Sequence, residues 1–258
     1  MTTNAPTQYA TDGNLRARQR LWERQEPAFD VVGWTLDLAG VEPGLQILDV
    51  GCGNGRYLSA MRSRGVDGFG CDVSPGMLRA VGDHPVVVAD AVSLPYPARR
   101  FDVVLAPHML YHVPDRPGAL REFRRVLAPS GRLVAVANGN GHLGSLRAVV
   151  DAAGGESQPG WRWTDRLAEE FSLDNGGPQL AIAFSDVRCV RPERAGRAIV
   201  TDPGVIAGYV ASVEDLYGPD FTGSWSALVA DVHATAAEII QRDGAFLVEG
   251  DVGAFVCS

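Results

Sequence analysis

Residues 47–55 read Ile-Leu-Asp-Val-Gly-Cys-Gly-Asn-Gly, an apolar run that leads directly into three alternating glycines. This pattern predicts a buried strand, a glycine-rich turn and then a helix. Glycines let the backbone of such a turn adopt positive φ and approach a ligand, and the helix N-terminus presents unpaired N–H groups to it. The dinucleotide fingerprint Gly-x-Gly-x-x-Gly fails because its sixth position is Arg56. Asp49, just inside the turn, would oppose a pyrophosphate and suits a ligand that carries positive charge.

Further apolar runs follow this motif and alternate with segments of helical pattern. We expect strands at residues 46–50, 68–73, 86–90, 101–106 and 132–137. Strands this apolar along their whole length are typical of a parallel sheet that helices cover on both faces.

Acidic residues stand at three of the predicted strand ends. Asp72 lies 21 positions after Gly51, and Asp90 ends the following strand. Because the carboxyl ends of parallel strands meet at one edge, Asp49, Asp72 and Asp90 are predicted to border one crevice. Asp72 has the position of a carboxylate that accepts the hydroxyl groups of a ribose.

Outside this core the patterns are weaker. Two amphipathic helices are expected within residues 15–38, and further helices at 164–171, 204–217 and 224–242. The remaining predictions are a loop at 154–160, one or two strands at 187–200 and a strand pair at 245–257. No linker separates a second core, so we expect a single α/β domain with helical additions.

The composition excludes several classes of protein. All 23 basic residues of the 258-residue chain are Arg, and the absence of Lys excludes Schiff-base enzymes, P-loop NTPases and protein kinases. The net charge of −8 disfavours general nucleic-acid binding. No apolar run has the length of a signal peptide or a membrane span, and the four Cys lack zinc-site spacing. We therefore expect a cytoplasmic protein with reduced thiols.

Five segments of the sequence carry a family resemblance. They are Leu48-Asp-Val-Gly-Cys-Gly-Asn-Gly55, Gly70-Cys-Asp-Val-Ser-Pro-Gly-Met-Leu78, Asp90-Ala-Val-Ser-Leu-Pro95, Phe101-Asp-Val-Val-Leu105 and Arg125-Val-Leu-Ala-Pro-Ser-Gly-Arg-Leu133. In order and spacing they resemble the class I S-adenosylmethionine-dependent methyltransferases, and within them the small-molecule group related to ubiquinone- and menaquinone-biosynthesis methyltransferases. The resemblance covers residues 45–138, and the ends of the chain match more loosely.

The resemblance implies a fold and a domain organisation. The fold would be α/β and Rossmann-like, with a mostly parallel seven-stranded sheet and helices on both faces. Residues 1–40 would form an N-terminal helical lid, in which Tyr9 would contact the cofactor. Residues 41–258 would form the methyltransferase domain, with helical cap insertions near 140–180 and 203–242.

The resemblance also implies a site for S-adenosylmethionine, with S-adenosylhomocysteine as the product. Gly51, Gly53 and Gly55 would line the methionine part of the cofactor. Asp49 would face its ammonium group through water, and Asp72 would hold the ribose hydroxyls.

The adenine would be bound by residues of the next strands. Val73 and Met77 would flank the ring, and Asp90 with the Ala91 backbone would contact its edge. Ala106, at the end of the fourth predicted strand, would offer its backbone carbonyl to the amino group of the cofactor.

Methyl transfer is an in-line displacement at a sulfonium carbon, so a base is needed only when the acceptor arrives protonated. Without Lys, that base must be His, Tyr, Asp or Glu. His108 and His112 follow the fourth predicted strand, four positions apart, and would share a helical face. They are our catalytic candidates; the alternative is that both are bonded to nearby backbone. Met109 stands where a zinc protease of the His-x-x-x-His type has Glu, and no metal is predicted.

The acceptor is expected to contact Tyr111, His142 and Trp163. Residues 161–225 hold eight aromatic side chains, which predict either an aromatic-lined pocket for a planar or apolar acceptor or the packing of a helical cap. The predicted partner is a small-molecule methyl acceptor, with no nucleic acid and no membrane, for a monomer or homodimer.

The leading hypothesis is transfer of a methyl group to an O or N atom of a small metabolite, with C-methylation less favoured. The Arg-, Gly- and Pro-rich composition suggests natural-product biosynthesis. The alternative is a protein of this fold that binds the cofactor without methyl transfer or catalyses another reaction at the sulfonium. A nicotinamide oxidoreductase is disfavoured by Arg56 and by Asp49.

Overall fold

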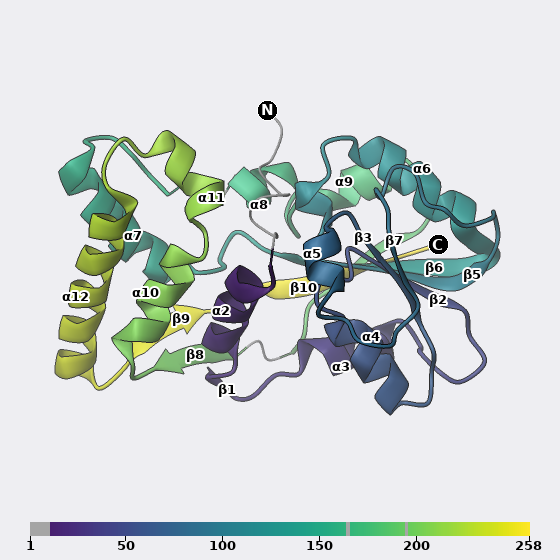
Figure 1. Ribbon diagram of the computed structural model, residues 1–258, viewed down its shortest axis with the longest axis horizontal. Helices are drawn as coiled ribbons and strands as arrows, with labels where there is room; N and C mark the ends of the chain where they lie inside the picture. Colours follow the sequence, from purple (N-terminus) through teal and green to yellow (C-terminus); the bar gives the residue numbers. More distant parts are fainter. Residues whose placement is uncertain (1–10, 164–165, 194–195) are drawn as a thin grey trace.

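A seven-stranded sheet forms the centre of the protein (Figure 1). The computed structural model describes residues 11–163, 166–193 and 196–258. The strand order is β4-β3-β2-β5-β6-β10-β7, with β10 antiparallel to both of its neighbours and the other pairs parallel. The strands are β2 Ile47–Val50, β3 Phe69–Asp72, β4 Val86–Val88, β5 Phe101–Pro107, β6 Leu127–Asn138, β7 Val187–Val190 and β10 Val252–Cys257. The predicted Rossmann-like, mostly parallel seven-stranded sheet is confirmed.

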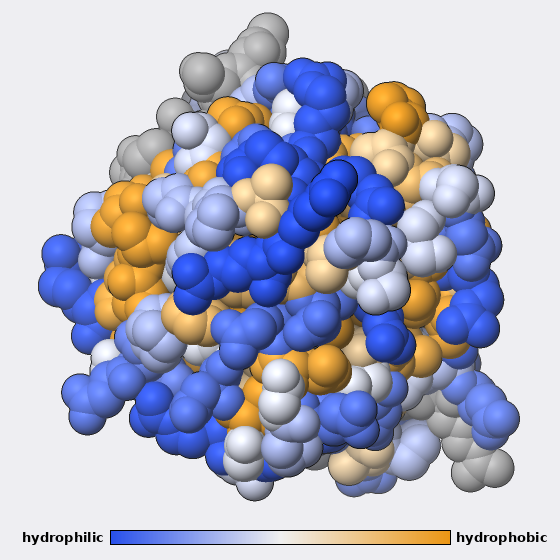
Figure 2. All heavy atoms as spheres, turned by 90° about the vertical axis from the view of Figure 1, so that its right-hand side faces the viewer, coloured by the Kyte–Doolittle hydropathy of each residue, from blue (hydrophilic) through white to orange (hydrophobic). Residues whose placement is uncertain are grey.

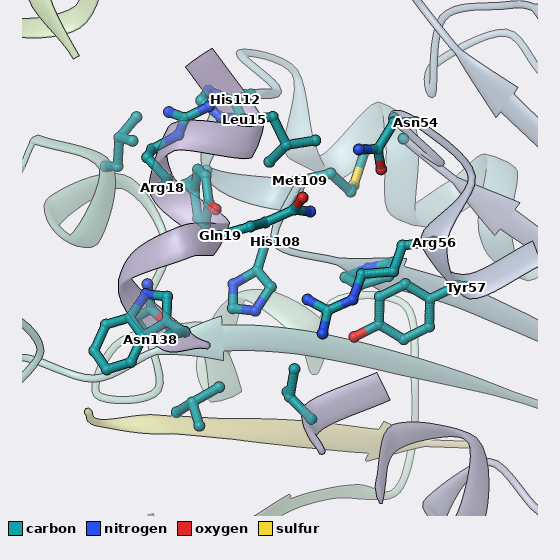
Figure 3. A pocket seen from close by; sticks show the side chains of 18 of the residues that line it. Leu15, Arg18, Gln19, Asn54, Arg56, Tyr57, His108, Met109, His112 and Asn138 are labelled. Atoms are coloured by element: carbon teal, nitrogen blue, oxygen red, sulfur yellow. The ribbon is translucent and has the colours of Figure 1, made fainter. Parts of the chain in front are cut away.

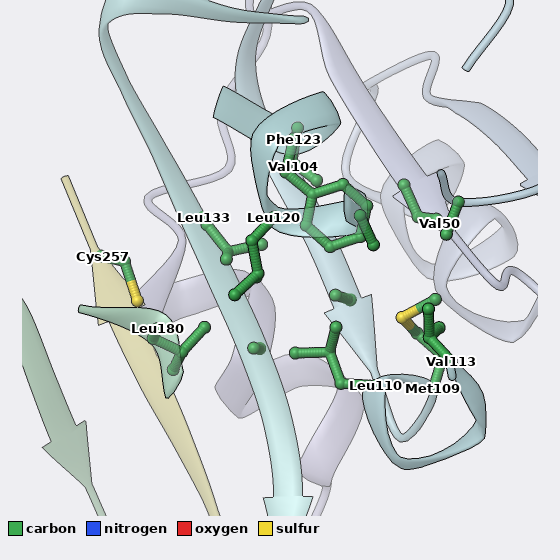
Figure 4. Close-up of a cluster of buried hydrophobic side chains, with 14 of the residues drawn as sticks. Val50, Val104, Met109, Leu110, Val113, Leu120, Phe123, Leu133, Leu180 and Cys257 are labelled. Carbon is green, nitrogen blue, oxygen red and sulfur yellow. The ribbon is translucent and has the colours of Figure 1, made fainter. Parts of the chain in front are cut away.

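Helices cover both faces of this sheet and bury its apolar side chains. The helices are α3 Val31–Leu38 and α4 Arg56–Ser63 on one face, and α6 Arg116–Val126 and α9 Gly176–Leu180 on the other. Short helices α5 Pro75–Leu78 and η1 Leu110–His112 follow β3 and β5. Figure 4 shows the cluster beneath α6, in which Leu120 and Phe123 of the helix meet Val104 of β5. These helices keep strands β2, β3 and β5 rigid at the ends that carry the predicted site.

Local sequence signals explain where these helices begin. Ser74 accepts a hydrogen bond from the Met77 N–H at 3.3 Å, which caps α5 before its first-turn proline. Asp115 caps α6 in the same way by accepting from the Gly118 N–H at 2.9 Å. The chain therefore turns into a helix directly after β3, as the Ser74-Pro75 pair predicts.

A second hydrophobic cluster lies beside the sheet and forms a cap. Its helices are α2 Gly13–Trp22, α7 Gly144–Ser157, α10 Pro203–Ala211, α11 Glu214–Tyr217 and α12 Trp225–Asp243, with α8 Arg166–Glu170 and η2 Gly218–Asp220 nearby in sequence. An antiparallel sheet of order β1-β8-β9 joins them, built from β1 Gln25–Glu26, β8 Arg197–Val200 and β9 Phe246–Glu249. The pairing of β1 with β8 joins Gln25 to Ala198, more than 170 positions along the chain, and no local sequence pattern shows it.

Two expectations differ from the structure. Residues 154–157 continue helix α7 instead of forming a loop. The ring of Trp161 packs against Gly154 of this helix so closely that a Cβ on Gly154 would lie 2.3 Å from Cε3 of Trp161. The strands at residues 245–257 do not pair with each other: β9 joins β8 in the small sheet and β10 joins β6 in the large one. The Gly250-Asp251 turn therefore links the cap to the main sheet.

The molecular surface is mostly hydrophilic on the face shown in Figure 2, where hydrophobic side chains form separate patches. The large exposed apolar residues among those described are Val73, Val88, Ile182 and Leu247. Within the described ranges, no helix combines the length and the apolarity that a membrane crossing needs.

Candidate active site

A cavity of about 1090 Å³ opens at the carboxyl ends of β2, β3 and β5, and the cap supplies its other walls (Figure 3). It lies where the strand order reverses between β2 and β5, the usual ligand position in open α/β sheets. The volume slightly exceeds the ~1,000 Å³ upper range of small-molecule pockets, so it can hold a nucleoside cofactor together with an acceptor. The predicted site residues that line it are Asp49, Gly51, Gly53, Asp72, Val73, Met77, Asp90, Ala91, His108, Tyr111, His112, His142 and Trp163.

Asp49 is the most unusual group of this cavity. Its side chain is fully buried, and neither carboxylate oxygen has a hydrogen-bond partner among the described residues. Burial raises the pKa of Asp49 well above its ordinary value, and the nearby charge of Asp72 raises it further. An ionised carboxylate is costly in this environment unless a cation compensates it. The position therefore suits a positively charged group of a ligand.

Neighbouring side chains pack closely against the glycine-rich turn after β2. Gly51 and Gly53 have φ of 70° and 55°, the left-handed region that favours glycine. A Cβ on Gly51 would lie 2.8 Å from the Met109 Cβ, and a Cβ on Gly53 would lie 3.5 Å from Leu15 of α2. The N-terminal helix thus packs directly over the turn.

Gly55 has a different role from the predicted one. It does not line the cavity; it is the N-cap of α4 at φ 79°, and a Cβ there would lie 2.9 Å from Cγ1 of Val81. Because Gly55 has no side chain, Val81 can pack against the start of α4. The prediction that Gly55 contacts the cofactor is not supported by this geometry.

Asp72 is held in place by the turn that it borders. Its Oδ2 accepts from the Gly53 N–H at 2.9 Å, and its Oδ1 accepts from the Ser74 N–H at 2.8 Å. Burial raises the pKa of Asp72, while these two backbone donors lower it. Each oxygen keeps an acceptor lone pair, so the carboxylate can bind two hydroxyl groups.

The predicted adenine residues lie around one part of the cavity. Val73 is 54% exposed and Met77 is buried, so each can offer an apolar wall. Asp90 accepts from the Val92 N–H at 3.1 Å and is exposed, whereas Ala91 is buried.

Ala106 and Tyr9 are not placed in the cavity. Ala106 is fully buried inside β5, opposite Ala135 of β6, and the next residue, Pro107, lines the cavity. The strand extends one residue further than expected, and the contact of the Ala106 carbonyl with the cofactor stays a prediction. Tyr9 lies outside the described residues.

His108 and His112 line the cavity but do not share a helical face. His108 precedes the short helix and has φ of 54°, in the left-handed region that few non-glycine residues adopt. Its backbone N–H donates to the Val136 carbonyl at 2.9 Å, which extends the β5–β6 ladder. Non-glycine residues in this conformation cost of order 1–3 kcal/mol and cluster at functional sites. The strain is a reason to retain His108 as a catalytic candidate.

Both histidines are neutral over the physiological range. Burial lowers the pKa of His108 to about 4, and the nearby Arg56 guanidinium acts in the same direction. Burial lowers the pKa of His112 to about 3, with a further contribution from Arg18. The Nδ1 atom of His108 has no hydrogen-bond partner among the described residues. Each can accept a proton, and each is a weak base.

Sequence reasoning missed much of the cavity wall. Figure 3 shows Arg18 and Gln19 of α2 on one side and Arg56 and Tyr57 of α4 on another. The helical pattern of α2 was visible in the sequence, but nothing local distinguished its cavity face from a core face. Other lining residues that were not predicted are Trp22, Asn54, Asn138 and Arg147.

The aromatic side chains of residues 161–225 show both predicted arrangements. Trp163, Phe171, Tyr209 and Tyr217 line the cavity. Trp163 also packs edge to face against Tyr209 and Tyr217 in the cap cluster. Phe221 packs against other aromatic rings of the cap and does not line the cavity.

Comparison with known proteins agrees with this geometry. Residues 48–135 match a family described as a methyltransferase domain. The ubiquinone/menaquinone biosynthesis C-methyltransferase UbiE of Vibrio campbellii is 35% identical over 147 residues, 52% of this chain and 53% of the relative. The 27-O-demethylrifamycin SV methyltransferase of Amycolatopsis mediterranei is 36% identical over 134 residues, 46% of each chain. The chain thus spans about half the length of the curated relatives it matches.

A solved structure extends the likeness of the fold. The YcgJ protein of Bacillus subtilis superposes with a TM-score of 0.54 at 17% identity, over 87% of this chain and 96% of that one. Residues 48–135 therefore match a methyltransferase domain, and about half of the chain is similar to ubiquinone/menaquinone-biosynthesis methyltransferases.

Proposed function

We propose that the protein binds S-adenosylmethionine in this cavity and transfers its methyl group to an oxygen or nitrogen atom of a small metabolite. The observation that carries the proposal is Asp49, a buried carboxylate without a partner among the described residues, next to a glycine-rich turn at the switch point of the sheet. A pyrophosphate would be repelled there. The ammonium group of a methionine moiety fits the charge that this position needs.

The chain offers a site for each part of the cofactor. Asp49 would face the ammonium group, and the Gly51–Gly53 turn would line the methionine chain. Asp72, oriented by two backbone N–H groups, would bind the ribose hydroxyls. Val73 and Met77 would flank the adenine, and we keep Asp90 and Ala91 as its edge contacts.

When bound, S-adenosylmethionine supplies a methyl group on a positively charged sulfur. A lone pair of the acceptor forms the new bond to the methyl carbon, and the electron pair of the broken carbon–sulfur bond stays on sulfur. His108, which follows β5 directly and lines the cavity, would take the proton that the acceptor loses, and His112 is the second candidate. Leu15 and Gln19 of α2 close over the cavity and exclude water from this step.

Relatives of different chemistry support the broad assignment without naming the acceptor. One is named as a C-methyltransferase of quinone biosynthesis and another as a methyltransferase of 27-O-demethylrifamycin SV. We therefore favour an O or N acceptor, with C-methylation as the less favoured case, and natural-product biosynthesis as the setting. The alternative function is cofactor binding without methyl transfer, or another reaction at the sulfonium.

Calorimetric titration with S-adenosylmethionine tests the cofactor assignment. Binding should be lost in Asp72→Ala and retained in the control Asp83→Ala, an exposed acid that does not line the cavity. Tighter binding of NAD than of S-adenosylmethionine would contradict the proposal.

Mass spectrometry of a panel of candidate acceptors tests the reaction. A product heavier by one methyl group supports transfer, whereas cofactor consumption with a different product supports the alternative. Full turnover in a variant with both His108→Phe and His112→Phe would remove the histidines as proton acceptors.

A further inference from the structure

His142 stands in the cavity wall on the side of the cap. It lies between β6 and α7, is buried, and stacks on Trp22 of α2 with ring centroids 4.9 Å apart and planes inclined by 26°. Both rings line the cavity. One face of the imidazole thus packs on Trp22, and the nitrogen atoms at its edge are the groups that can make hydrogen bonds.

One edge atom of this imidazole is already used. The Asp251 backbone N–H donates a hydrogen bond to Nδ1 of His142 at 3.4 Å. Burial lowers the pKa of His142 to about 3, so the ring is neutral and carries one proton. Because Nδ1 accepts a hydrogen bond, that proton is on Nε2. Near neutral pH, His142 is therefore a hydrogen-bond donor and cannot act as the base through Nε2.

The loop that carries His142 is held by the turn between β9 and β10. The Gly139 N–H donates to the Asp251 carbonyl at 2.9 Å, and the Gly141 N–H donates to its Oδ2 at 3.1 Å. The Leu143 N–H donates to the Glu249 carbonyl at 3.0 Å. These bonds keep the imidazole in one position before any ligand binds, which is the condition for selective recognition.

The backbone of Leu143, next to His142, shows that packing contacts force the conformation of this loop. Leu143 has φ of 62° and, like His108, is a non-glycine residue in the left-handed region that lines the cavity. The cap therefore holds the His142 loop in a conformation that its residues do not favour by themselves.

Charged side chains of both signs line the cavity. The carboxylates Asp49 and Asp72 lie in β2 and β3, and Asp90 follows β4. The guanidinium groups of Arg18 and Arg147 come from α2 and α7, and that of Arg147 acts on the pKa of His142. Glu23, Asp30 and Arg56 also line the cavity, so neither side carries one sign of charge alone. Close to His142, the guanidinium groups favour an electron-rich or anionic oxygen of a ligand.

We propose that His142 determines acceptor specificity by donating its Nε2–H to an oxygen of the methyl acceptor other than the atom that is methylated. A donor on the methylated atom itself would draw electron density from the lone pair that attacks the methyl carbon. The acceptor class is a planar hydroxy compound with a neighbouring carbonyl or carboxylate oxygen, enclosed by Trp163 and Tyr209. The inference deepens the proposed function and rests on it for the identity of the reaction.

A matched pair of probes tests the preference for a second oxygen. The probes are 3-hydroxy-2-naphthoate and 2-naphthol, which share the ring hydroxyl and differ in the carboxylate, and binding is followed by quenching of Trp fluorescence. The wild type with S-adenosylhomocysteine should bind the naphthoate tenfold or more tightly than 2-naphthol, because a buried donor left unpaired weakens binding by about this factor.

Two variants separate the donor from the ring. His142→Phe keeps the stack on Trp22 and should lose most of the preference, whereas His142→Gln retains an amide donor near the Nε2 position and should keep part of it. An equal preference in the wild type and His142→Phe would overturn the proposal, and so would equal affinities of the wild type for both probes.

Nitrogen-15 NMR of the imidazoles gives a reading that needs neither the acceptor nor turnover. The signals of His142, identified by their loss in His142→Phe, should show the neutral Nε2–H tautomer from pH 8 to pH 5. A proton on Nδ1 would overturn the proposal. If S-adenosylhomocysteine binds to the wild type and to both variants, the proposed function survives whatever the probes show. If S-adenosylhomocysteine binds to none of them, the proposed function fails. The tautomer of His142 and the preference of the ligand-free protein between the two probes then still decide the role of His142.

Discussion

Replacing Asp49 by Asn should stabilise the ligand-free protein and abolish cofactor binding. The carboxylate is fully buried and has no hydrogen-bond partner among the described residues, and the Asp72 charge stands nearby. Because folding raises the pKa of Asp49, its contribution to stability is full below the unfolded pKa of about 3.9 and is lost as the pH rises through the folded pKa. At pH 7 this loss is at most about 4 kcal/mol. The limit follows because pH 7 lies about 3 units above the unfolded pKa and each unit corresponds to about 1.36 kcal/mol.

The amide of Asn removes the charge at nearly the same volume but still lacks partners. The protonated carboxyl group of the wild type lacks the same partners, so the cost of a buried polar group without partners largely cancels, and the net gain in the free energy of unfolding at pH 7 should approach but not exceed about 4 kcal/mol. The gain should shrink at pH 4, where the wild-type carboxyl group can be protonated at little cost.

Urea unfolding at pH 7 and pH 4, with and without S-adenosylhomocysteine, measures both effects. At a hundred times its dissociation constant the ligand should stabilise the wild type by about 2.7 kcal/mol and leave Asp49→Asn unchanged. Asp83→Asn, at an exposed site outside the cavity, serves as the control with no change. A variant that is less stable than the wild type at pH 7, or whose gain is the same at both pH values, would refute the assignment of Asp49 as a partner for a cation.

Three further predictions follow from single positions. His108→Asn keeps a residue that tolerates φ of 54°, so unfolding should change by less than about 1 kcal/mol while turnover falls about 10²- to 10⁴-fold; unchanged turnover would place the base elsewhere. Gly55→Ala should lower the free energy of unfolding, measured by thermal denaturation, by about 2–4 kcal/mol, because the new Cβ meets both a positive φ and the side chain of Val81. The control Gly44→Ala, at φ of 98° with open space around it, should lower it by about 1–2 kcal/mol. The contribution of His142 to stability should be lost as the pH falls from about 6.5 to about 3, because the unfolded chain binds a proton that the buried imidazole, with its pKa lowered to about 3, does not bind. In a urea series over this range, wild-type stability should therefore decrease more with falling pH than that of His142→Phe, which shares every other titrating group.

Much of the sheet and of the cofactor end was predictable because both are local in sequence. A buried parallel strand is apolar along its length, and its carboxyl end is followed by the turn that meets the ligand. Asp49, Gly51, Gly53 and Asp72 therefore follow from position along the chain, and all of them line the cavity. Gly55 obeys the same spacing but faces Val81, because the direction of a Cβ depends on packing that the spacing does not report.

The cap was less predictable because its contacts join distant parts of the chain. Gln25 pairs with Ala198, and β9 leaves its sequence neighbour β10 to join β8. The left-handed conformation of His108 is equally invisible, because strand β5 continues to Pro107 and the chain must then turn within one residue.

The sequence by itself determined the apolar strands, the glycine-rich turn and the acids at the strand ends, since each depends on neighbours within one βα unit. Only the tertiary structure decided which side chains of the cap complete the cavity wall. Asp251 is 109 positions from His142, yet its backbone N–H donates to Nδ1 of that imidazole. Hydrogen-bond direction and burial depend on contacts between distant parts of the chain, and the roles that we propose for His142 and His108 rest on them.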